Sequence, residues 1–523
     1  MNEKKSLLRS TSLVSVNRII SSILGFTRDM LWTRIFGATS SFDAFVIAFH
    51  LPSFISFVIT EAGLTQAFTP VLSENQTKQN ISEIRQFISH ACALLLLGLV
   101  LIVIFSVTFS SGIIHLFAPG IRDMSLAVSL FQIMATGILF TTLAALCSAI
   151  LNTLGNYGTP SAMPIVFNGV VIISTIFLTT FFKTPIYVIA WAILFSGIVQ
   201  LLMQLPLLHK KQLLVKPVFS IKDADVRKMV KLMLPALLSV SVMQTGVLVD
   251  FMFSSRLPVG SITWLYYSAR LMELPVGVIA IGIATVVLPH LARNHAAQDH
   301  ENYNHSLNWA IRLSLFFGIP ASVGLFVLAT PIVATLFGHG LFSPHDVVMS
   351  AKSTQAFAIG IVGFMLTRIC ASGFYAKQNT KLPVKASFIA LLINIILNFV
   401  LVSRLAHAGL ALATSVSGLV NAAILLTALI KKKYYYPSST VLNFIYKIVA
   451  STVIMTTTLY LISSDTHTWL YSNLSWQIEH LFLSMIIAIF IYCFSMIVLF
   501  GCRFSVFRRN VGKSLLLNER LNN

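Results

Sequence analysis

Ala91–Phe109 reads ACALLLLGLVLIVIFSVTF, nineteen residues without a charged side chain. A helix that crosses the hydrocarbon core of a bilayer needs about 20 mostly apolar residues, so this stretch is long enough to span a membrane. Comparable stretches lie at 165–182, 386–402 and 486–500. Of the 523 residues, 56% are hydrophobic and only 10% are charged, unlike the mixture typical of soluble proteins. The sequence therefore predicts an all-α polytopic membrane protein.

We expect about fourteen spanning helices, joined by connections whose basic content alternates. The approximate spans are 12–36, 43–69, 87–117, 127–154, 161–182, 186–208, 228–255, 262–292, 306–337, 346–376, 383–403, 407–430, 442–463 and 478–502. The net charge of +19 lies mostly in alternate connections, most densely between Lys210 and Lys231. Connections rich in Lys and Arg stay in the cytoplasm, so both termini are expected there. A charge that follows topology also argues against nucleic acid as a partner.

The two halves of the chain resemble each other at a spacing of roughly 220 residues. The clearest match joins 190–200 to 411–421, the sixth helix of each half, and Leu51-Pro52 matches Leu274-Pro275. Six helices return the chain to its starting side, so the repeat predicts two parallel lobes. The expected divisions are a lobe at 1–209, a basic cytoplasmic linker at 210–227, a second lobe at 228–433, two appended helices at 434–502 and a cytoplasmic tail at 503–523. The alternative is a chance recurrence of small residues in apolar helices.

Ionisable residues cluster inside several expected spans, where each is expensive unless it faces water or a partner. They are Arg18, Arg28 and Asp29 in the first span, Asp43 and Glu61 in the second, and Arg270 and Glu273 in the eighth. Arg18, Ser22 and Asp29 share one helix face, which we expect to line water. Arginine binds phosphate through a planar fork of donors. We therefore expect a cationic cavity for an anionic substrate; the alternative is that these charges are paired structural bridges.

A second group of polar residues lies in the seventh, eleventh and twelfth spans. It comprises Asp250, Asn394, Asn398 and Thr414. Hard oxygen ligands of this kind suit a small cation. Asn and Thr are equally suited to be hydrogen-bond partners between helices, so both interpretations stay open.

Catalytic motifs are not evident in the sequence. We find no phosphate-binding glycine-rich loop, no paired Cys or His metal motif and no nucleophile elbow. The five cysteines lie singly in apolar stretches and are expected to be packing residues. The expectation is a transporter without a resident cofactor, apart from a bound cation, rather than an enzyme.

Ordered motifs along nearly the whole chain resemble those of one known family. They include LGFTRD at 24–29, RIFGA at 34–38, EAGLTQAF at 61–68, WLYYSARLMELP at 264–275 and GFYAKQ at 373–378. This series closely resembles the MurJ (MviN) lipid II flippases, members of the multidrug/oligosaccharidyl-lipid/polysaccharide exporter superfamily. The resemblance implies two six-helix lobes in a V, alternating access, and two extra helices that form a groove for a polyprenyl tail.

The resemblance also implies a substrate and residues that contact it. Family members flip lipid II, an undecaprenyl diphosphate carrying the peptidoglycan building block, to the outer face of the bacterial cytoplasmic (inner) membrane. The family's cavity arginines correspond to Arg28 and Arg270, with Arg18 nearby, and its acidic positions to Asp29, Asp43, Glu61 and Glu273. A sodium site of some members corresponds to Asp250, Asn394, Asn398 and Thr414. Expected partners are lipid II, membrane lipids and the cell-wall synthesis machinery.

Three positions depart from the family pattern. An arginine is usual at the position of Ser22 or Ile23 and at that of Ser56, and an aspartate is common at that of Ala269. The alternatives are therefore a flippase for another polyprenyl-linked glycan, a cation-coupled exporter, or a membrane scaffold for wall synthesis that transports nothing.

Overall fold

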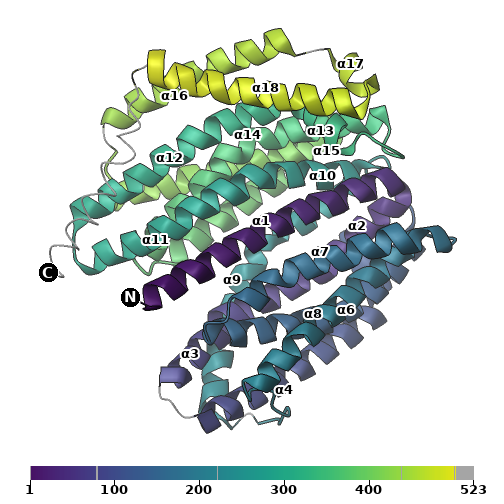
Figure 1. The fold of residues 1–523 in the computed structure, drawn as a ribbon, viewed down its shortest axis with the longest axis vertical. Coiled ribbons are helices and arrows are strands. Elements are labelled where there is room, and N and C mark those ends of the chain that lie inside the picture. The colour runs from purple at the N-terminus through teal and green to yellow at the C-terminus, as the bar shows by residue number, and fades with distance from the viewer. Residues whose placement is uncertain are drawn as a thin grey trace. The chain divides into compact units, whose positions relative to one another are not determined.

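The computed structural model describes residues 2–77, 81–220, 222–437, 439–463, 465–499 and 501, and every regular element among them is a helix (Figure 1). In this part of the chain, twelve helices are long and apolar enough to cross a membrane. One of them, α15 (Lys381–Lys431), contains a non-helical residue, Ala406, and so supplies two spans. The charged first helix, α1 (Asn2–Phe36), is also long enough to cross. Fourteen spans result, as the sequence predicts; the predicted tail at 503–523 lies outside the described residues.

Contacts divide the chain into two compact units, Met1–Thr263 and Trp264–Asn523. After α1, the first unit holds α2 (Ser40–Val58), η1 (Ile59–Phe68), α3 (Thr69–Thr77), α4 (Ile81–Thr108), α5 (Ser110–Phe117), α6 (Met124–Thr153), α7 (Gly158–Leu178), η2 (Thr179–Phe181), α8 (Ile186–Lys210) and α9 (Ala224–Ser254). Helix α10 (Ser261–Pro275) begins in this unit and continues into the second.

The second unit continues with η3 (Val276–Ala280), α11 (Ile281–Ala296), α12 (His300–Val327), α13 (Ala329–Phe337), α14 (Pro344–Tyr375), α15, α16 (Ser439–Ile462), α17 (Thr466–Tyr471), α18 (Leu474–Phe494) and η4 (Ser495–Leu499). Two spans contain π-helical segments: η1 follows α2, and η3 follows α10. These are the second spans of the two predicted repeats. Insertions of π-helix are rare and often lie at functional sites.

Helix α9 packs with the first unit, although the repeat assigns it to the second lobe. Near the start of α9, Asn75 Nδ2 on α3 donates to Asp225 Oδ2 at 2.8 Å, and Lys228 pairs with Glu74. Further along, Ala236 and Val240 of α9 pack against α2 and η1. The contact boundary at Thr263 and the predicted linker at 210–227 thus differ by one helix, and the lobe boundary stays a prediction.

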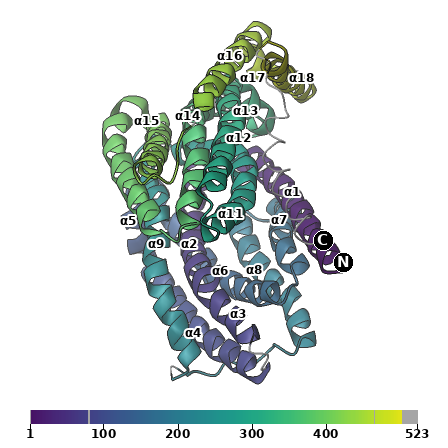
Figure 2. The ribbon, with the colours of Figure 1, turned by 90° about the vertical axis from the view of Figure 1, so that its left-hand side faces the viewer.

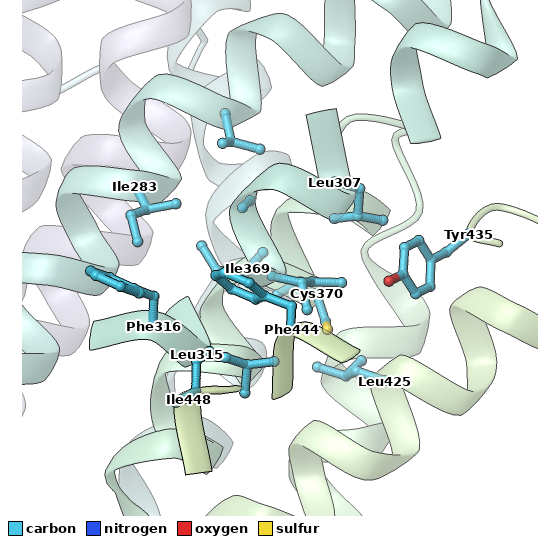
Figure 3. Packing of buried hydrophobic residues seen from close by; sticks show 14 of the residues in the cluster. Ile283, Leu307, Leu315, Phe316, Ile369, Cys370, Leu425, Tyr435, Phe444 and Ile448 are labelled. Carbon is cyan, nitrogen blue, oxygen red and sulfur yellow. The ribbon is translucent and has the colours of Figure 1, made fainter. Parts of the chain in front are cut away.

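The core of the second unit explains how the last two spans attach. Figure 3 shows Ile283, Phe316, Ile369 and Phe444 packed together, from α11, α12, α14 and α16. Tyr492 of α18 donates a hydrogen bond to the Phe316 carbonyl at 2.8 Å. Helices α16 and α18 lie side by side (Figures 1 and 2). The appended helices therefore pack on α12.

Helices α14 and α15 approach each other so closely that only glycine fits between them. A Cβ atom on Gly363 would lie 2.7 Å from the backbone nitrogen of Leu419, and one on Gly360 would lie 2.7 Å from the Ser415 Cα. The hydroxyl of Ser415 donates to the Ala356 carbonyl at 2.7 Å. Small residues at the interface and a hydrogen bond across it are typical of helix packing in membranes.

Candidate functional site

Arg28 and Asp29 of α1 form a buried ion pair in the first unit. Arg28 is 6% exposed and Asp29 is 0% exposed. The guanidinium donates to Asp29 Oδ1 through Nε at 3.1 Å and Nη2 at 2.8 Å, and through Nη1 to Asn168 Oδ1 on α7 at 3.1 Å. It also lies over the Trp32 ring, 4.4 Å from its centre. The charge of Arg28 is therefore compensated by neighbours in this state, as buried charges require.

The expectation that one face of α1 lines water is only partly met. Arg18 and Ser22 are exposed, and the Ser22 hydroxyl donates to the Arg18 carbonyl at 2.9 Å. Asp29, at the other end of the same face, is buried instead, so the prediction is wrong there. The physical reason is that Asp29 neutralises Arg28, and the pair packs on α7. Sequence reasoning missed Asn168, which also donates to the Ser21 carbonyl at 3.2 Å and so joins α7 to α1.

Asp43 lies near the start of α2 and holds the N-terminus of α10. Its Oδ2 accepts from the backbone N–H of Gly260 at 2.7 Å, and its Oδ1 accepts from the N–H and hydroxyl of Thr263 at 2.9 and 2.6 Å. The first N–H groups of a helix have no partner within it, and a carboxylate is favoured there by the helix dipole. These three hydrogen bonds of Asp43 hold the start of α10 in place.

Glu61 and Ser56 lie on either side of the junction between α2 and η1. Glu61 belongs to the π-helix and accepts from Gln66 Nε2 at 3.5 Å. The Ser56 hydroxyl lies 3.2 Å from the Thr142 hydroxyl and 3.4 Å from that of Thr141, both on α6. Where the family usually has arginine, this chain therefore has a neutral contact between two helices.

Arg270 and Glu273 form the predicted pair one turn apart on α10. Arg270 Nη1 lies 3.2 Å from Glu273 Oε2, and the two side chains are 33% and 59% exposed. This confirms the pairing within one helix. Both residues belong to the second unit, whereas Arg18, Arg28, Asp29, Asp43 and Glu61 belong to the first. The shared cationic cavity stays a prediction.

Three of the four residues of the expected cation site are brought together. Asn394 Nδ2 donates to the Thr414 hydroxyl at 3.1 Å, and Asn398 Nδ2 donates to Asn394 Oδ1 at 3.3 Å. Both asparagines are buried. This geometry is the hydrogen-bonding alternative named above. Asp250 lies on α9 in the first unit, so the four-residue sodium site stays a prediction.

A network that the sequence did not predict holds α10 against α14. Trp264 Nε1 donates to Asp346 Oδ1 at 2.9 Å, and the Ser268 hydroxyl donates to the Ser350 carbonyl at 2.8 Å. Asp346 also forms a capping box with Ser343 at the start of α14. The Ser-x-x-Asp spacing was a visible signal for the cap, but not for its tryptophan partner.

A groove between α12 and α16 was also not located from the sequence. It has a volume of about 240 Å³, and its wall is formed by Ile319, Val323, Val449, Thr452, Val453, Thr456 and Thr457. Thr456 and Thr457 donate to the carbonyls of Thr452 and Val453 on their own helix. These bonds satisfy two hydroxyls internally and leave mostly methyl groups to face the groove.

Comparisons with known proteins point to one family. The family model described as "Lipid II flippase MurJ" matches residues 32–479. A relative from Buchnera aphidicola, described as a probable lipid II flippase MurJ, is 35% identical over 94% of this chain and 98% of its own length. The lipid II flippase MurJ of Burkholderia cenocepacia is 32% identical over 86% of this chain and 89% of its own.

Solved structures agree on the fold. A lipid II flippase MurJ in an inward closed conformation matches with a TM-score of 0.79 and 28% identity, covering 94% of this chain and 99% of that one. An inward-facing multidrug resistance MATE transporter of the MOP superfamily matches with a TM-score of 0.69 at 16% identity, over 81% of this chain and 98% of its own, which supports the fold alone. This multi-pass membrane protein belongs to the lipid II flippase MurJ family.

Proposed function

We propose that this chain moves lipid II from the inner to the outer leaflet of the bacterial cytoplasmic membrane by alternating access, for peptidoglycan synthesis. The family match over 32–479 carries the proposal. The paired arginines inside spanning helices support it, because a diphosphate crossing a bilayer needs compensating charge along its route. In this scheme both termini lie in the cytoplasm, which the alternation of basic connections supports.

Arg270 is the proposed first contact for the diphosphate. Its side chain is one-third exposed, and its partner Glu273 is more exposed still, so the pair is solvated and opens at low cost. An incoming diphosphate offers bidentate acceptors in place of one carboxylate oxygen. Arg18, exposed on α1, is the proposed second contact, and Arg28 engages only when Asp29 releases it.

The acidic residues are proposed to organise the empty protein. Asp29 keeps Arg28 neutralised, Asp43 holds the start of α10, and Glu61 sits in a π-helix that changes the register of the second span. Alternating access needs elements with two discrete arrangements. In this scheme the bonds of Asp43 form in one state and break in the other.

The groove between α12 and α16 is the proposed path of the polyprenyl tail. Its wall is apolar, and two of its threonine hydroxyls bond to their own helix rather than project as donors. A wall that presents mostly methyl groups suits a hydrocarbon chain, although the buried hydroxyl of Thr452, which also lines the groove, has no hydrogen-bond partner among the described residues.

The energy source in this scheme is either sodium or membrane potential. Asp250, Asn394, Asn398 and Thr414 are the proposed sodium ligands, since their oxygens suit a hard cation. The potential contributes about 2.3 kcal/mol per charge per 100 mV. The two sources are distinguished by measuring transport at fixed membrane potential. If sodium is the source, transport requires sodium and fails in the Asp250→Asn variant.

Complementation tests the proposed function. A bacterium depleted of its lipid II flippase is supplied with this chain, and lipid II exposed on the outer leaflet is measured alongside growth. We expect both to be restored, and both to be lost in Arg270→Ala. Arg34→Ala is the matched control, because Arg34 lies exposed in the last turn of α1.

A flippase for another polyprenyl-linked glycan is the second candidate. The observation that favours it is the neutral contact of Ser56 with Thr142 at a position where the family usually has arginine. Stable, membrane-inserted protein that leaves lipid II unexposed would support this candidate and refute the first.

A further inference from the structure

The linker (residues 210–227) is held against the first turns of α4 by specific hydrogen bonds. Arg85 Nε donates to the Gln212 carbonyl at 2.7 Å. The buried hydroxyl of Ser89 donates to the Lys216 carbonyl at 2.6 Å and accepts from the Val218 N–H at 3.1 Å. His90 Nδ1 lies 2.8 Å from Asp223 Oδ2. Contacts at three successive points give the described linker residues a defined position on α4.

Along the linker, Leu213 is buried and Val215 is half-buried, whereas residues 216–219 are all exposed. Leu213 is buried in the core of the first unit, and Val215 packs against the same core. Leu214 is 50% exposed, and Val218 and Phe219 are both 54% exposed. Three large apolar side chains are therefore presented outward by a segment that lies outside the spanning helices.

The same surface is strongly basic. Seven Lys or Arg and two Asp residues lie between 210 and 231. The two carboxylates are engaged, since Asp223 pairs with His90 and Asp225 accepts from Asn75. Lys211, Lys216 and Lys222 are exposed. Exposed apolar side chains beside lysines are the chemistry of a membrane-surface element, where the lysines meet anionic headgroups.

We propose that residues 211–220, together with Lys222, form a docking surface for anionic phospholipid headgroups of the cytoplasmic leaflet. The lysines contact the phosphates, and Leu214, Val218 and Phe219 enter the headgroup region. Contact with the lipid surface then holds the starts of α4 and α9 against the leaflet from which substrate is drawn. This inference rests on the orientation given in the proposed function, with the linker in the cytoplasm.

Lipid binding to the purified full chain tests the proposal. The protein in detergent is titrated with phosphatidylglycerol or phosphatidylcholine, and bound lipids are counted by native mass spectrometry. Each lysine near an anionic surface contributes about a fivefold gain in binding. We therefore expect the K211Q/K216Q/K222Q variant to lose at least about tenfold in phosphatidylglycerol affinity, with little change for phosphatidylcholine.

The K431Q/K432Q/K433Q variant is the matched control, because it makes the same charge change in another basic connection. An equal loss in both triple variants, or none in the linker variant, overturns the proposal. Orientation is checked separately by labelling F219C with a membrane-impermeant maleimide in a chain without other cysteines. Labelling in right-side-out vesicles overturns the assignment to the cytoplasmic leaflet. Neither readout depends on transport, so a failure of lipid II flipping would leave both results interpretable.

Discussion

Replacing Asp43 by asparagine removes the carboxylate that accepts three hydrogen bonds at the start of α10. The asparagine keeps one oxygen and turns an NH₂ group toward N–H donors, so at least one bond becomes a repulsion. Hydrogen bonds to a charged group contribute about 1.5–3 kcal/mol each, but bonds to one carboxylate are not additive. We expect the docked start of α10 to lose about 3 kcal/mol, which is roughly a 150-fold shift in its opening equilibrium.

Hydrogen exchange of the Gly260 and Thr263 amides measures this opening directly. Both amides donate to Asp43, so their exchange is expected to accelerate by roughly 150-fold in the Asp43→Asn variant. Thr263→Val is the matched control: it removes only the hydroxyl bond of 2.6 Å and keeps both backbone bonds. Its expected loss is about 1.5 kcal/mol, or roughly 13-fold faster exchange. Unchanged protection of both amides in Asp43→Asn would refute the assigned role of the carboxylate.

Three further changes probe contacts elsewhere in the two units. Asp29→Asn leaves Arg28 buried beside a neutral partner and is expected to destabilise the protein by about 3–5 kcal/mol, seen as a lower Tm in detergent; an unchanged Tm would contradict the pairing. Gly363→Ala places a Cβ 2.7 Å from the α15 backbone and is expected to cost about 1–3 kcal/mol by the same measurement. Burial alone would raise the pKa of Asp223, but hydrogen bonds from His90 and two backbone N–H groups hold it below 3.8. Because the pKa of Asp223 is lowered in the folded protein, its ionised carboxylate stabilises the linker fully at pH values above about 3.8, and this stabilisation is lost as the pH falls through the lowered pKa. Limited proteolysis of the linker should therefore increase only below about pH 3.8.

The spans themselves were predictable because a bilayer imposes a length and an apolar composition on each helix. The break at Ala406, for example, falls between the expected spans 383–403 and 407–430, although the backbone around it is otherwise helical. The six-residue helix α17 was missed because it is too short to show an apolar period. Its boundaries depend on a local cap, in which Asp465 accepts from the Thr468 N–H at 3.0 Å.

Whether a contact in the candidate site could be predicted depends on how far apart its two residues lie along the chain. The pairing of Arg270 with Glu273 follows from a spacing of three residues on one helix, so it was visible in the sequence. The bond between Asp43 and Thr263 joins residues 220 positions apart, and the bond between Arg28 and Asn168 joins residues 140 apart. A single sequence gives the chemistry of such residues but not their partners, because helix packing decides which faces meet.

Arg28 and Arg270, the two predicted substrate arginines, lie in different electrostatic surroundings. This difference decides which of them is proposed to contact the substrate first. Arg28 is buried between Asp29, Asn168 and Trp32, so an anion that reaches it must replace bonds that already satisfy the guanidinium. Arg270 pairs with Glu273 at 3.2 Å, and its side chain is 33% exposed and therefore partly solvated. Removing Arg270 is therefore expected to weaken substrate capture while changing the free energy of unfolding by no more than about 1 kcal/mol, which leaves Tm close to that of the parent. Removing Arg28 leaves Asp29 as a buried, uncompensated charge and is expected to lower both stability and transport. If the Arg28→Ala variant has an unchanged Tm but no transport, the buried ion pair is not what stabilises α1, and Arg28 acts on the substrate alone.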